Sequence, residues 1–199
     1  MEQRTPIRRE TIIDSMLEMT AEQGVDRVTT RALAKRLGVS EPTLYRQFAG
    51  GKAEMWRALA ETLGEKMQKA WHSALWNAED GAMERLRALT RAQLHLVATT
   101  PALPAILFSR TLQRDNAELR QGVGGVAARF HAHLEQIVID GQRAGELKVD
   151  VSARDAAWLL ISSIQGTAIR WILSEYTLDP EDEGRRVLEI VLAGLRTTS

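Results

Sequence analysis

The sequence predicts an all-α fold, and three observations support that prediction. Apolar residues recur at spacings of three and four along most of the 199 residues, which is the period of an α-helix. Runs of β-branched residues are few, so there is almost no strand signal. Glycines and five prolines punctuate the chain where helices can begin and end. We expect about nine helices, the first three of which form a small N-terminal domain.

The first two helices are predicted from their start and stop residues. Pro6 suits the first position of a helix, because proline lacks an N–H that the helix could not bond there. That helix ends at Gly24. Thr29 or Thr30 can cap a short second helix, which ends at Gly38.

The third helix begins after the tripeptide Gly38-Val39-Ser40. Ser40 can cap it, and Pro42 then lies in its first turn, where proline is tolerated. Leu44 and Phe48 lie four residues apart, so both can point into the core. The sequence Ala-Gly-Gly that follows Phe48 ends the helix.

A larger helical body is predicted for the rest of the chain. Lys52 opens a helix of about 26 residues that joins the small domain to the body. The predicted domains are therefore residues 1–51 and 52–199. The further helices are expected from Ala82 to Thr99, from Pro101 to about Gln113, from Asn116 to between Gly141 and Gly145, from Ala153 to Glu175, and from Asp179 onward.

The charge balance is zero overall but uneven along the chain. Lys and Arg number 26, as do Asp and Glu, which argues against general attraction to nucleic acid or membrane. Between Arg27 and Lys52, six basic residues face one acid, so this segment carries +5 and the remainder −5. We therefore expect a basic N-terminal head on a mildly acidic body.

Composition also indicates the compartment. The chain has no cysteine, which excludes disulfides and thiolate metal sites and fits a reducing cytosol. The N-terminus has no apolar segment of the kind found in secretory signals. The most apolar stretch, residues 156–173, is interrupted by Ser162, Ser163, Gln165 and Arg170, so we do not expect it to span a membrane. A soluble cytoplasmic protein is predicted.

Two short helices joined by a Gly-Val-Ser turn are typical of a helix-turn-helix, whose second helix enters the DNA major groove. Arg46 on that helix can read guanine or bind phosphate, while Thr43 and Pro42 can contact a thymine methyl. Tyr45 and Gln47 can bond phosphate oxygens. A solvated corner of a helical bundle is the alternative, and the local charge of +5 favours DNA binding over it.

The segment TTRALAKRLGVSEPTLYRQF, followed by KAEM, resembles the DNA-binding head of TetR-family transcriptional regulators. The similarity is nearly continuous over residues 7–56, and a weaker one covers residues 144–171 of the body. The family commonly has histidine at the position of Gln47, and its loop before Lys52 is commonly one residue shorter. The resemblance implies a homodimer, a body pocket for an effector, and repression that ends when the effector binds. It assigns DNA contact to Thr29, Thr30, Arg31, Ser40, Glu41, Pro42, Thr43, Tyr45, Arg46, Gln47 and Lys52.

The helix at residues 153–175 is apolar almost all round, so it should be buried on more than one side. One side can face its own body and the other a second copy of the chain. A two-fold dimer would place two reading helices about 34 Å apart, on a roughly palindromic operator. A helix wholly internal to a monomer is the alternative. The predicted dimer residues are Leu160, Ile164, Ala168, Trp171, Leu188 and Leu192.

Apolar residues of the middle helices predict a pocket for a small hydrophobic effector. Each could equally fill the core. The segment 101–108, with two prolines, is the best candidate for a moving element. The predicted pocket residues are Met67, Trp71, Leu94, Leu103, Leu107, Phe108 and Phe130.

The sequence offers little support for an enzyme. Four histidines occur, at 72, 95, 131 and 133, without the spacing of a metal site. Nucleophile elbows, P-loops and paired catalytic carboxylates are absent from the sequence. We therefore predict a transcriptional repressor with no metal and no cofactor. The alternatives are a DNA-binding regulator without a small-molecule effector, and a small-ligand enzyme on a helical bundle.

Overall fold

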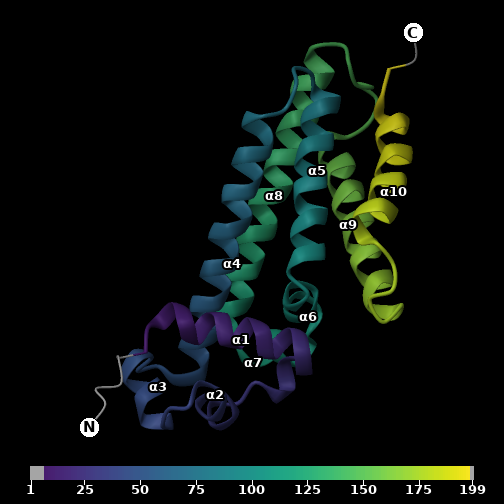
Figure 1. The fold of residues 1–199 in the computed structure, drawn as a ribbon. Helices are drawn as coiled ribbons and strands as arrows, with labels where there is room; N and C mark the ends of the chain where they lie inside the picture. The colour runs from purple at the N-terminus through teal and green to yellow at the C-terminus, as the bar shows by residue number, and fades with distance from the viewer. Residues whose placement is uncertain (1–6, 198–199) are drawn as a thin grey trace. The chain divides into compact units, whose positions relative to one another are not determined.

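The computed structural model describes residues 7–197, and every regular element within them is helical (Figure 1). The predicted all-α fold is therefore confirmed for this part of the chain. Pro6, the expected start of the first helix, lies outside the described residues. The elements are α1 (Arg9–Gln23), η1, a short 3-10 helix (Val25–Arg27), α2 (Thr30–Leu37), α3 (Glu41–Gln47), α4 (Gly51–Trp76), α5 (Ala82–Thr99), α6 (Ala102–Phe108), α7 (Arg110–Asp115), α8 (Ala117–Arg143), α9 (Ala153–Leu173) and α10 (Pro180–Leu195).

Capping residues begin several helices where the sequence predicts. The Thr29 hydroxyl accepts a hydrogen bond from the N–H of Ala32 at 3.1 Å, which begins α2. Asn116 caps α8 by accepting from the N–H of Leu119 at 3.0 Å. The side chains of Ser152 and Asp179 accept from backbone N–H groups in the first turns of α9 and α10. Each of these caps satisfies an N–H that the helix itself leaves unbonded.

One detail of the predicted helix pattern is wrong. The single helix expected between Pro101 and Gln113 is two helices, because the chain turns at Ser109, whose hydroxyl accepts from the N–H of Leu112 at 3.2 Å. The described residues therefore form ten α-helices instead of about nine. The helix from Asn116, by contrast, ends at Arg143, within the predicted interval between Gly141 and Gly145.

The chain divides into two compact units. Unit 1 comprises residues up to 64 together with 101–124, and unit 2 comprises residues 65–100 and 125 onward. The segment carrying α6 and α7 therefore groups with the N-terminal helices, whereas the predicted domains divide the chain at residue 52. Two of the three unit boundaries fall inside the long helices α4 and α8, and the third lies between α5 and α6.

Unit 1 is built around α1, which packs against α2 and α6. Its core contains Ile12 and Met16 of α1, Leu33 of α2, Leu44 in the middle of α3 and Phe48 directly after α3, each at most 1% exposed. Burial of such side chains contributes about 1.5–3 kcal/mol each. The two anchors predicted for the third helix, Leu44 and Phe48, are thus confirmed as core residues.

Unit 2 is a bundle in which α10 packs against both α5 and α9. Close approach of α10 and α5 depends on Gly184, because a Cβ there would lie 2.5 Å from Cδ2 of Leu94. Among the described residues, α9 has the length and apolar composition that could cross a membrane. Its inner face is buried in unit 2, which accounts for that composition in a core helix.

Candidate nucleic-acid interface

The turn between α2 and α3 is shaped by Gly38. This residue has φ +63° and ψ +31°, a left-handed conformation that glycine adopts without steric cost. Its N–H donates to the carbonyl of Lys35 at 3.2 Å, and the N–H of Val39 donates to that of Ala34 at 3.0 Å. Together these bonds end α2 and redirect the chain into α3.

The start of α3 differs in one contact from the prediction. Ser40 occupies the capping position and Pro42 lies in the first turn, both as predicted, but the Ser40 side chain makes no capping bond. Its hydroxyl instead lies 2.9 Å from the hydroxyl of Thr43, whose N–H donates to the Ser40 carbonyl. The helix is therefore begun by backbone geometry, and both hydroxyls lie at the exposed surface.

The side chains predicted to contact DNA all reach the surface of unit 1, and none is buried. Tyr45 is 45% exposed, although it is a large aromatic residue, while its neighbour Leu44 is fully buried. Arg46 is exposed and donates to the Thr43 hydroxyl at 3.0 Å. One face of α3 thus anchors the helix and the other presents hydrogen-bonding groups, the arrangement that a recognition helix requires.

Thr30 and Glu41 link the two helices of the motif. The Thr30 hydroxyl donates to Oε2 of Glu41 at 2.8 Å, which joins the first turn of α2 to the first turn of α3. Both residues belong to the predicted DNA-contact set. This hydrogen bond therefore links the two helices of the motif to each other directly.

Arg9 of α1 ties down the other end of α3. Its Nη1 donates to the carbonyl of Gln47 at 2.6 Å, and its guanidinium lies 4.1 Å from the centre of the Phe48 ring. Its Nη2 lies 2.8 Å from Oε1 of Glu54 in α4. A cation suits this place because the carbonyls at a helix C-terminus carry partial negative charge. We call Arg9 and Glu54 the Arg9 clamp.

The Arg9 clamp also holds the loop that is longer than the family's common form. Oε2 of Glu54 accepts from the N–H of Gly50 at 2.8 Å. This bond, followed by the one from Arg9, lowers the pKa of the Glu54 carboxyl below its ordinary value. Gly51 closes the loop at φ +66°, and a Cβ there would lie 3.2 Å from the Tyr45 ring. The glycine thus keeps the loop against the exposed tyrosine.

The basic charge of the head is not all directed outward. Arg36, one of the six basic residues of the +5 segment, pairs with Glu22 at 2.6 Å and Glu18 at 2.9 Å, both on α1. The hydrogen bond from Arg36 is also the largest cause of a lowered pKa at Glu22. Arg36 therefore connects α2 to α1, a structural role that the charge count alone does not reveal.

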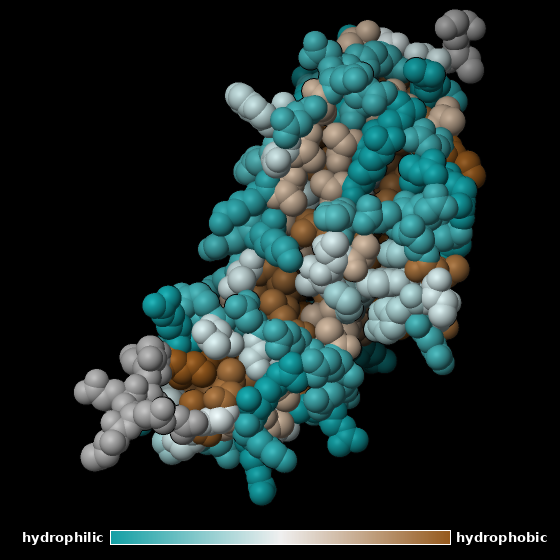
Figure 2. Space-filling model, viewed as in Figure 1, coloured by the Kyte–Doolittle hydropathy of each residue, from teal (hydrophilic) through white to brown (hydrophobic). Residues whose placement is uncertain are grey.

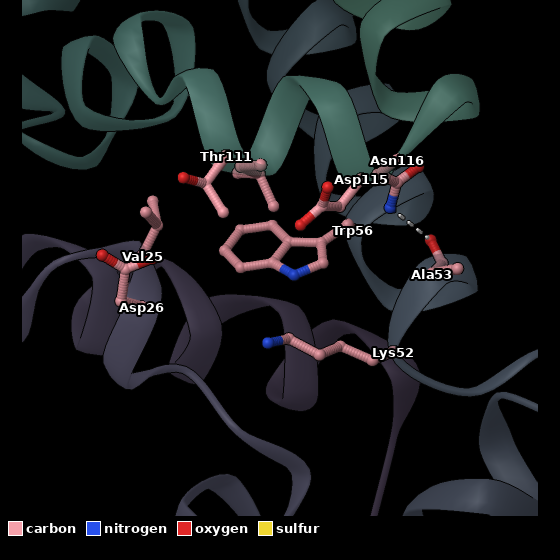
Figure 3. Close-up of a pocket in the computed structure, with 9 residues that line it drawn as sticks. Val25, Asp26, Lys52, Ala53, Trp56, Thr111, Asp115 and Asn116 are labelled. Carbon is pink, nitrogen blue, oxygen red and sulfur yellow. Dashed lines mark hydrogen bonds between the residues drawn. The ribbon is translucent and has the colours of Figure 1, made fainter.

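Lys52, predicted to bind phosphate, is exposed at the start of α4. It also lines a cavity of about 290 Å³ within unit 1. In Figure 3 its side chain runs along one side of the Trp56 ring. Its predicted contact with DNA stays a prediction.

Sequence comparison identifies the family of this helix-turn-helix chain. Residues 12–59 match the family model of bacterial regulatory proteins of the tetR family. Residues 79–195, more than half of the chain, match the tetracyclin repressor-like C-terminal domain. The chain belongs to the TetR family. Its members are transcriptional regulators that bind DNA, so the predicted resemblance is confirmed and the enzyme alternative is not supported.

Curated relatives cover most of the chain. The nucleoid occlusion factor SlmA of Vibrio campbellii is 29% identical over 174 residues, which are 87% of this chain and 88% of the relative. The fatty acid metabolism regulator protein of Bacillus subtilis is 26% identical over 184 residues, 92% and 93% of the two chains.

Solved structures of TetR-type regulators have the same fold. FadR from Bacillus subtilis, solved in complex with stearoyl-CoA, matches with a TM-score of 0.78 at 25% identity and covers 95% of this chain and 100% of its own. The ketosteroid regulator KstR2 of Mycobacterium tuberculosis matches with a TM-score of 0.78 at 18% identity, with 98% of each chain covered.

The predicted effector-pocket residues divide between the two units. In unit 2, Met67, Trp71, Leu94 and Phe130 are buried, and the rings of Trp71 and Phe130 lie 4.8 Å apart between centroids. Nε1 of Trp71 donates to Gln93 at 2.8 Å, which places one polar group among them. In unit 1, Leu103 is buried, Leu107 is half-buried and Phe108 is 40% exposed.

The predicted dimer residues face inward in unit 2. Leu160, Ile164, Ala168, Trp171, Leu188 and Leu192 are all at most 7% exposed within the single chain. Their burial holds α9 and α10 in the bundle. The same helices carry an outward apolar set, and Figure 2 shows separate brown areas among teal atoms on the side of the body where α9 and α10 lie. This set, which sequence reasoning missed, comprises Trp158, Leu159, Ile169, Leu173 and Ile190.

Histidines do not assemble a metal site. Among the described residues, no group of three or more His, Cys, Asp or Glu side chains could hold a metal ion. His72 and His133 lie 6.1 Å apart between ring centroids, and His131 stacks near Trp158. The pKa of His133 is lowered, first by burial and then by the nearby His72.

Proposed function

We propose that this TetR-family regulator is a homodimeric repressor whose α3 helices read a palindromic operator and which a mostly apolar effector releases. The observation that carries the proposal is the two-faced α3. Leu44 and Phe48 anchor the helix, while Tyr45 and Arg46 stay exposed. An exposed tyrosine and arginine beside a buried leucine have a clear use when the exposed face meets DNA.

DNA binding is tested by fluorescence anisotropy with fragments from the chain's own genomic neighbourhood. We expect specific binding that weakens steeply as salt rises. Lys52→Ala should weaken binding to all DNA sequences alike. It should also reduce the slope of the logarithm of the binding constant against the logarithm of the salt concentration by about one per protomer. If the wild-type chain raised the anisotropy of none of these fragments at low salt, the proposal would be contradicted.

The homodimer is proposed to form through the outward apolar set on α9 and α10. Leu173 is 77% exposed and Ile190 is 75% exposed in the single chain. Several large apolar side chains exposed on two helices that pack together suit an interaction site better than isolated ones would. Ile190→Glu should convert a dimer into a monomer in multi-angle light scattering, whereas Val149→Glu, on an equally exposed loop residue, should not. A wild-type monomer at micromolar concentration would contradict the homodimer.

An apolar effector is supported by the relatives, two of which are named for fatty acid metabolism or solved with an acyl-CoA. Stearoyl-CoA is therefore the first compound to test. A ligand that binds only the folded protein raises its melting temperature, by an amount that grows with ligand concentration. It should also lower operator affinity, because it prefers the geometry that does not bind DNA. Free coenzyme A is the matched control for the acyl chain.

The second candidate is a regulator that has no small-molecule effector. The SlmA relatives are named for nucleoid occlusion, and the predicted pocket residues of unit 2 are packed against each other. An unchanged melting temperature with stearoyl-CoA and across a broad lipophilic panel would favour this candidate. Under either candidate the proposed location is the cytoplasm, where the DNA lies.

A further inference from the structure

The cavity in unit 1 has the features of a second ligand site. Its volume of about 290 Å³ lies between η1, the first turns of α4, and α7 (Figure 3). This is at the small end of the range for ligand pockets, so it suits a molecule of few heavy atoms. Its polar lining comes from Asp26, Lys52, Trp56, Thr111, Asp115 and Asn116, and the amide of Asn116 donates to the carbonyl of Ala53 at 3.4 Å.

Trp56 provides the first indication of a ligand site, because it carries a buried donor. Its side chain is 2% exposed, and within the described residues its Nε1–H has no hydrogen-bond partner. The buried Trp71, by contrast, donates its Nε1–H to Gln93. A buried donor without an acceptor is unfavourable, so native structures satisfy nearly all of them. In Figure 3 the Trp56 nitrogen lies on the edge of the ring nearer Lys52.

The charges of the lining provide the second indication. Lys52 supplies an ammonium group, and Asp26 and Asp115 supply carboxylates. Asp115 also accepts from Arg114 at 2.7 Å, which lowers the pKa of its carboxyl and keeps it ionised. A simple anion would meet two carboxylates here, and a simple cation would leave the indole N–H unpaired. A molecule that carries both charges can place its cation at a carboxylate and its anion at the indole N–H.

We propose that the cavity binds a small zwitterion of the amino-carboxylate class. Its carboxylate accepts from the Trp56 Nε1–H and from Lys52, and its ammonium lies beside Asp115. The ammonium also meets the π-face of the indole, an interaction that favours cations. A small movement of the exposed Lys52 side chain admits the carboxylate to the ring edge.

This site regulates DNA binding through Lys52, a consequence that rests on the proposed function. Lys52 is predicted to bind a DNA phosphate, and one ammonium cannot serve the phosphate and the ligand equally well. Occupancy of the cavity therefore lowers operator affinity, and the operator lowers ligand affinity by the same factor.

The binding test uses the full chain without DNA. Glycine, β-alanine and γ-aminobutyrate are titrated into ¹⁵N-labelled protein while the indole N–H resonances are followed. At least one of these probes should shift the Trp56 resonance downfield to saturation and leave that of Trp71 in place. Loss of one resonance in Trp56→Phe, or sequential assignment, identifies the signal. Acetate and methylammonium, which carry the two charges separately, should each act at least about tenfold more weakly, because each lacks half of the contacts.

Variants of the lining sharpen this test. Lys52→Met and Asp115→Asn should each weaken the shift at least about tenfold, since one charge-assisted bond is lost. Lys69→Met, at another exposed lysine of α4, should leave it unchanged. A Trp56 resonance that stays still at tens of millimolar of every probe would overturn the site. An equal response to acetate alone would overturn the zwitterion.

The regulatory step is measured separately by operator affinity. The probe that moves Trp56 should lower affinity about tenfold in the wild type and have no effect in Lys52→Met. Unchanged affinity at saturation would overturn the competition for Lys52. Loss of all DNA binding without any probe would instead contradict the proposed function, whereas a still Trp56 resonance with normal DNA binding would contradict only the cavity site.

Discussion

Units 1 and 2 hold their helices together in different ways. In unit 1, polar contacts at the surface join elements far apart in sequence, such as the Arg9 clamp and the bond from Thr30 to Glu41. Unit 2 has polar links of this kind as well, from Arg87 to Glu189 and from His95 to Glu181, but its predicted ligand-contacting residues are buried side chains such as Trp71 and Phe130. The difference follows from what each unit must leave exposed.

The side chains of unit 1 that are proposed to contact DNA must stay exposed, so their burial cannot stabilise this unit. Exposed polar pairs are individually weak and are screened by salt, so they orient the head without making it rigid. The buried core of unit 2 is closely packed, and a lost side chain there leaves a cavity. We therefore expect mutations in unit 2 to affect mainly stability and mutations in unit 1 to affect mainly DNA affinity.

The largest expected effect is the loss of Trp71. Trp71→Ala removes a ring that is 1% exposed, its contact with Phe130, and the partner of Gln93. We expect the free energy of unfolding to fall by about 3–5 kcal/mol, measured by chemical denaturation. Trp76→Ala on the same helix is the matched control, because Trp76 is 89% exposed and its loss should change stability by at most about 0.5 kcal/mol. Similar losses in both variants would contradict the description of unit 2.

The next largest effect is expected at Arg46, and it concerns DNA affinity instead of stability. Arg46→Ala should cost about 1–3 kcal/mol of operator binding and, if the guanidinium reads a base, relax the preference at one position in each half-site. Its unfolding free energy should stay within about 0.5 kcal/mol of the wild type because the side chain is exposed.

Arg143→Ala, an exposed arginine in unit 2, is the control for the removed charge. Its operator affinity should match that of the wild type. If both variants lost affinity equally, overall charge would explain DNA binding, and Arg46 would have no specific role.

The helices and the motif were predictable from sequence because they depend on local patterns. Thr29, Asn116, Ser152 and Asp179 each begin a helix through a contact within three residues. Hydrophobic spacing likewise placed Leu44 and Phe48 in the core of unit 1. Such signals survive in a single sequence, since both partners lie close together in it.

The remaining features depend on partners that are far apart in the chain. Arg9 and Glu54 are 45 residues apart, and no pattern in either neighbourhood announces their pairing. The longer loop before Lys52 was the one indication that something unusual holds this region. Hydrophobic pattern also failed to tell which face of α9 is inward, because that helix is apolar almost all round, and Leu160 proved buried where Leu159 is exposed.

The Arg9 clamp should have a smaller effect than Arg46, since it acts by positioning α3. Arg9→Met removes the bonds to Gln47 and Glu54 while keeping an unbranched apolar stem over Phe48. We expect operator affinity to fall about threefold to fivefold, as for the loss of an exposed ion pair. Arg8→Met, at the neighbouring arginine, is the control for the removed charge, and it should lower operator affinity by less than Arg9→Met does. Equal losses would mean that Arg9 acts through charge alone.

The smallest effect is expected from His133 in unit 2, and it depends on pH. Burial and the nearby His72 lower the pKa of His133 in the folded chain below its ordinary value of 6.5. Between the two values the unfolded chain binds more protons, so stability is complete above pH 6.5 and declines as the pH falls toward the folded pKa. The melting temperature should therefore drop between pH 7 and pH 5.5, and His133→Gln should reduce that drop. His95→Gln, which changes a histidine on the surface, should leave the drop in melting temperature as it is in the wild type. An identical drop in the wild type and both variants would show that the burial of His133 has no thermodynamic consequence.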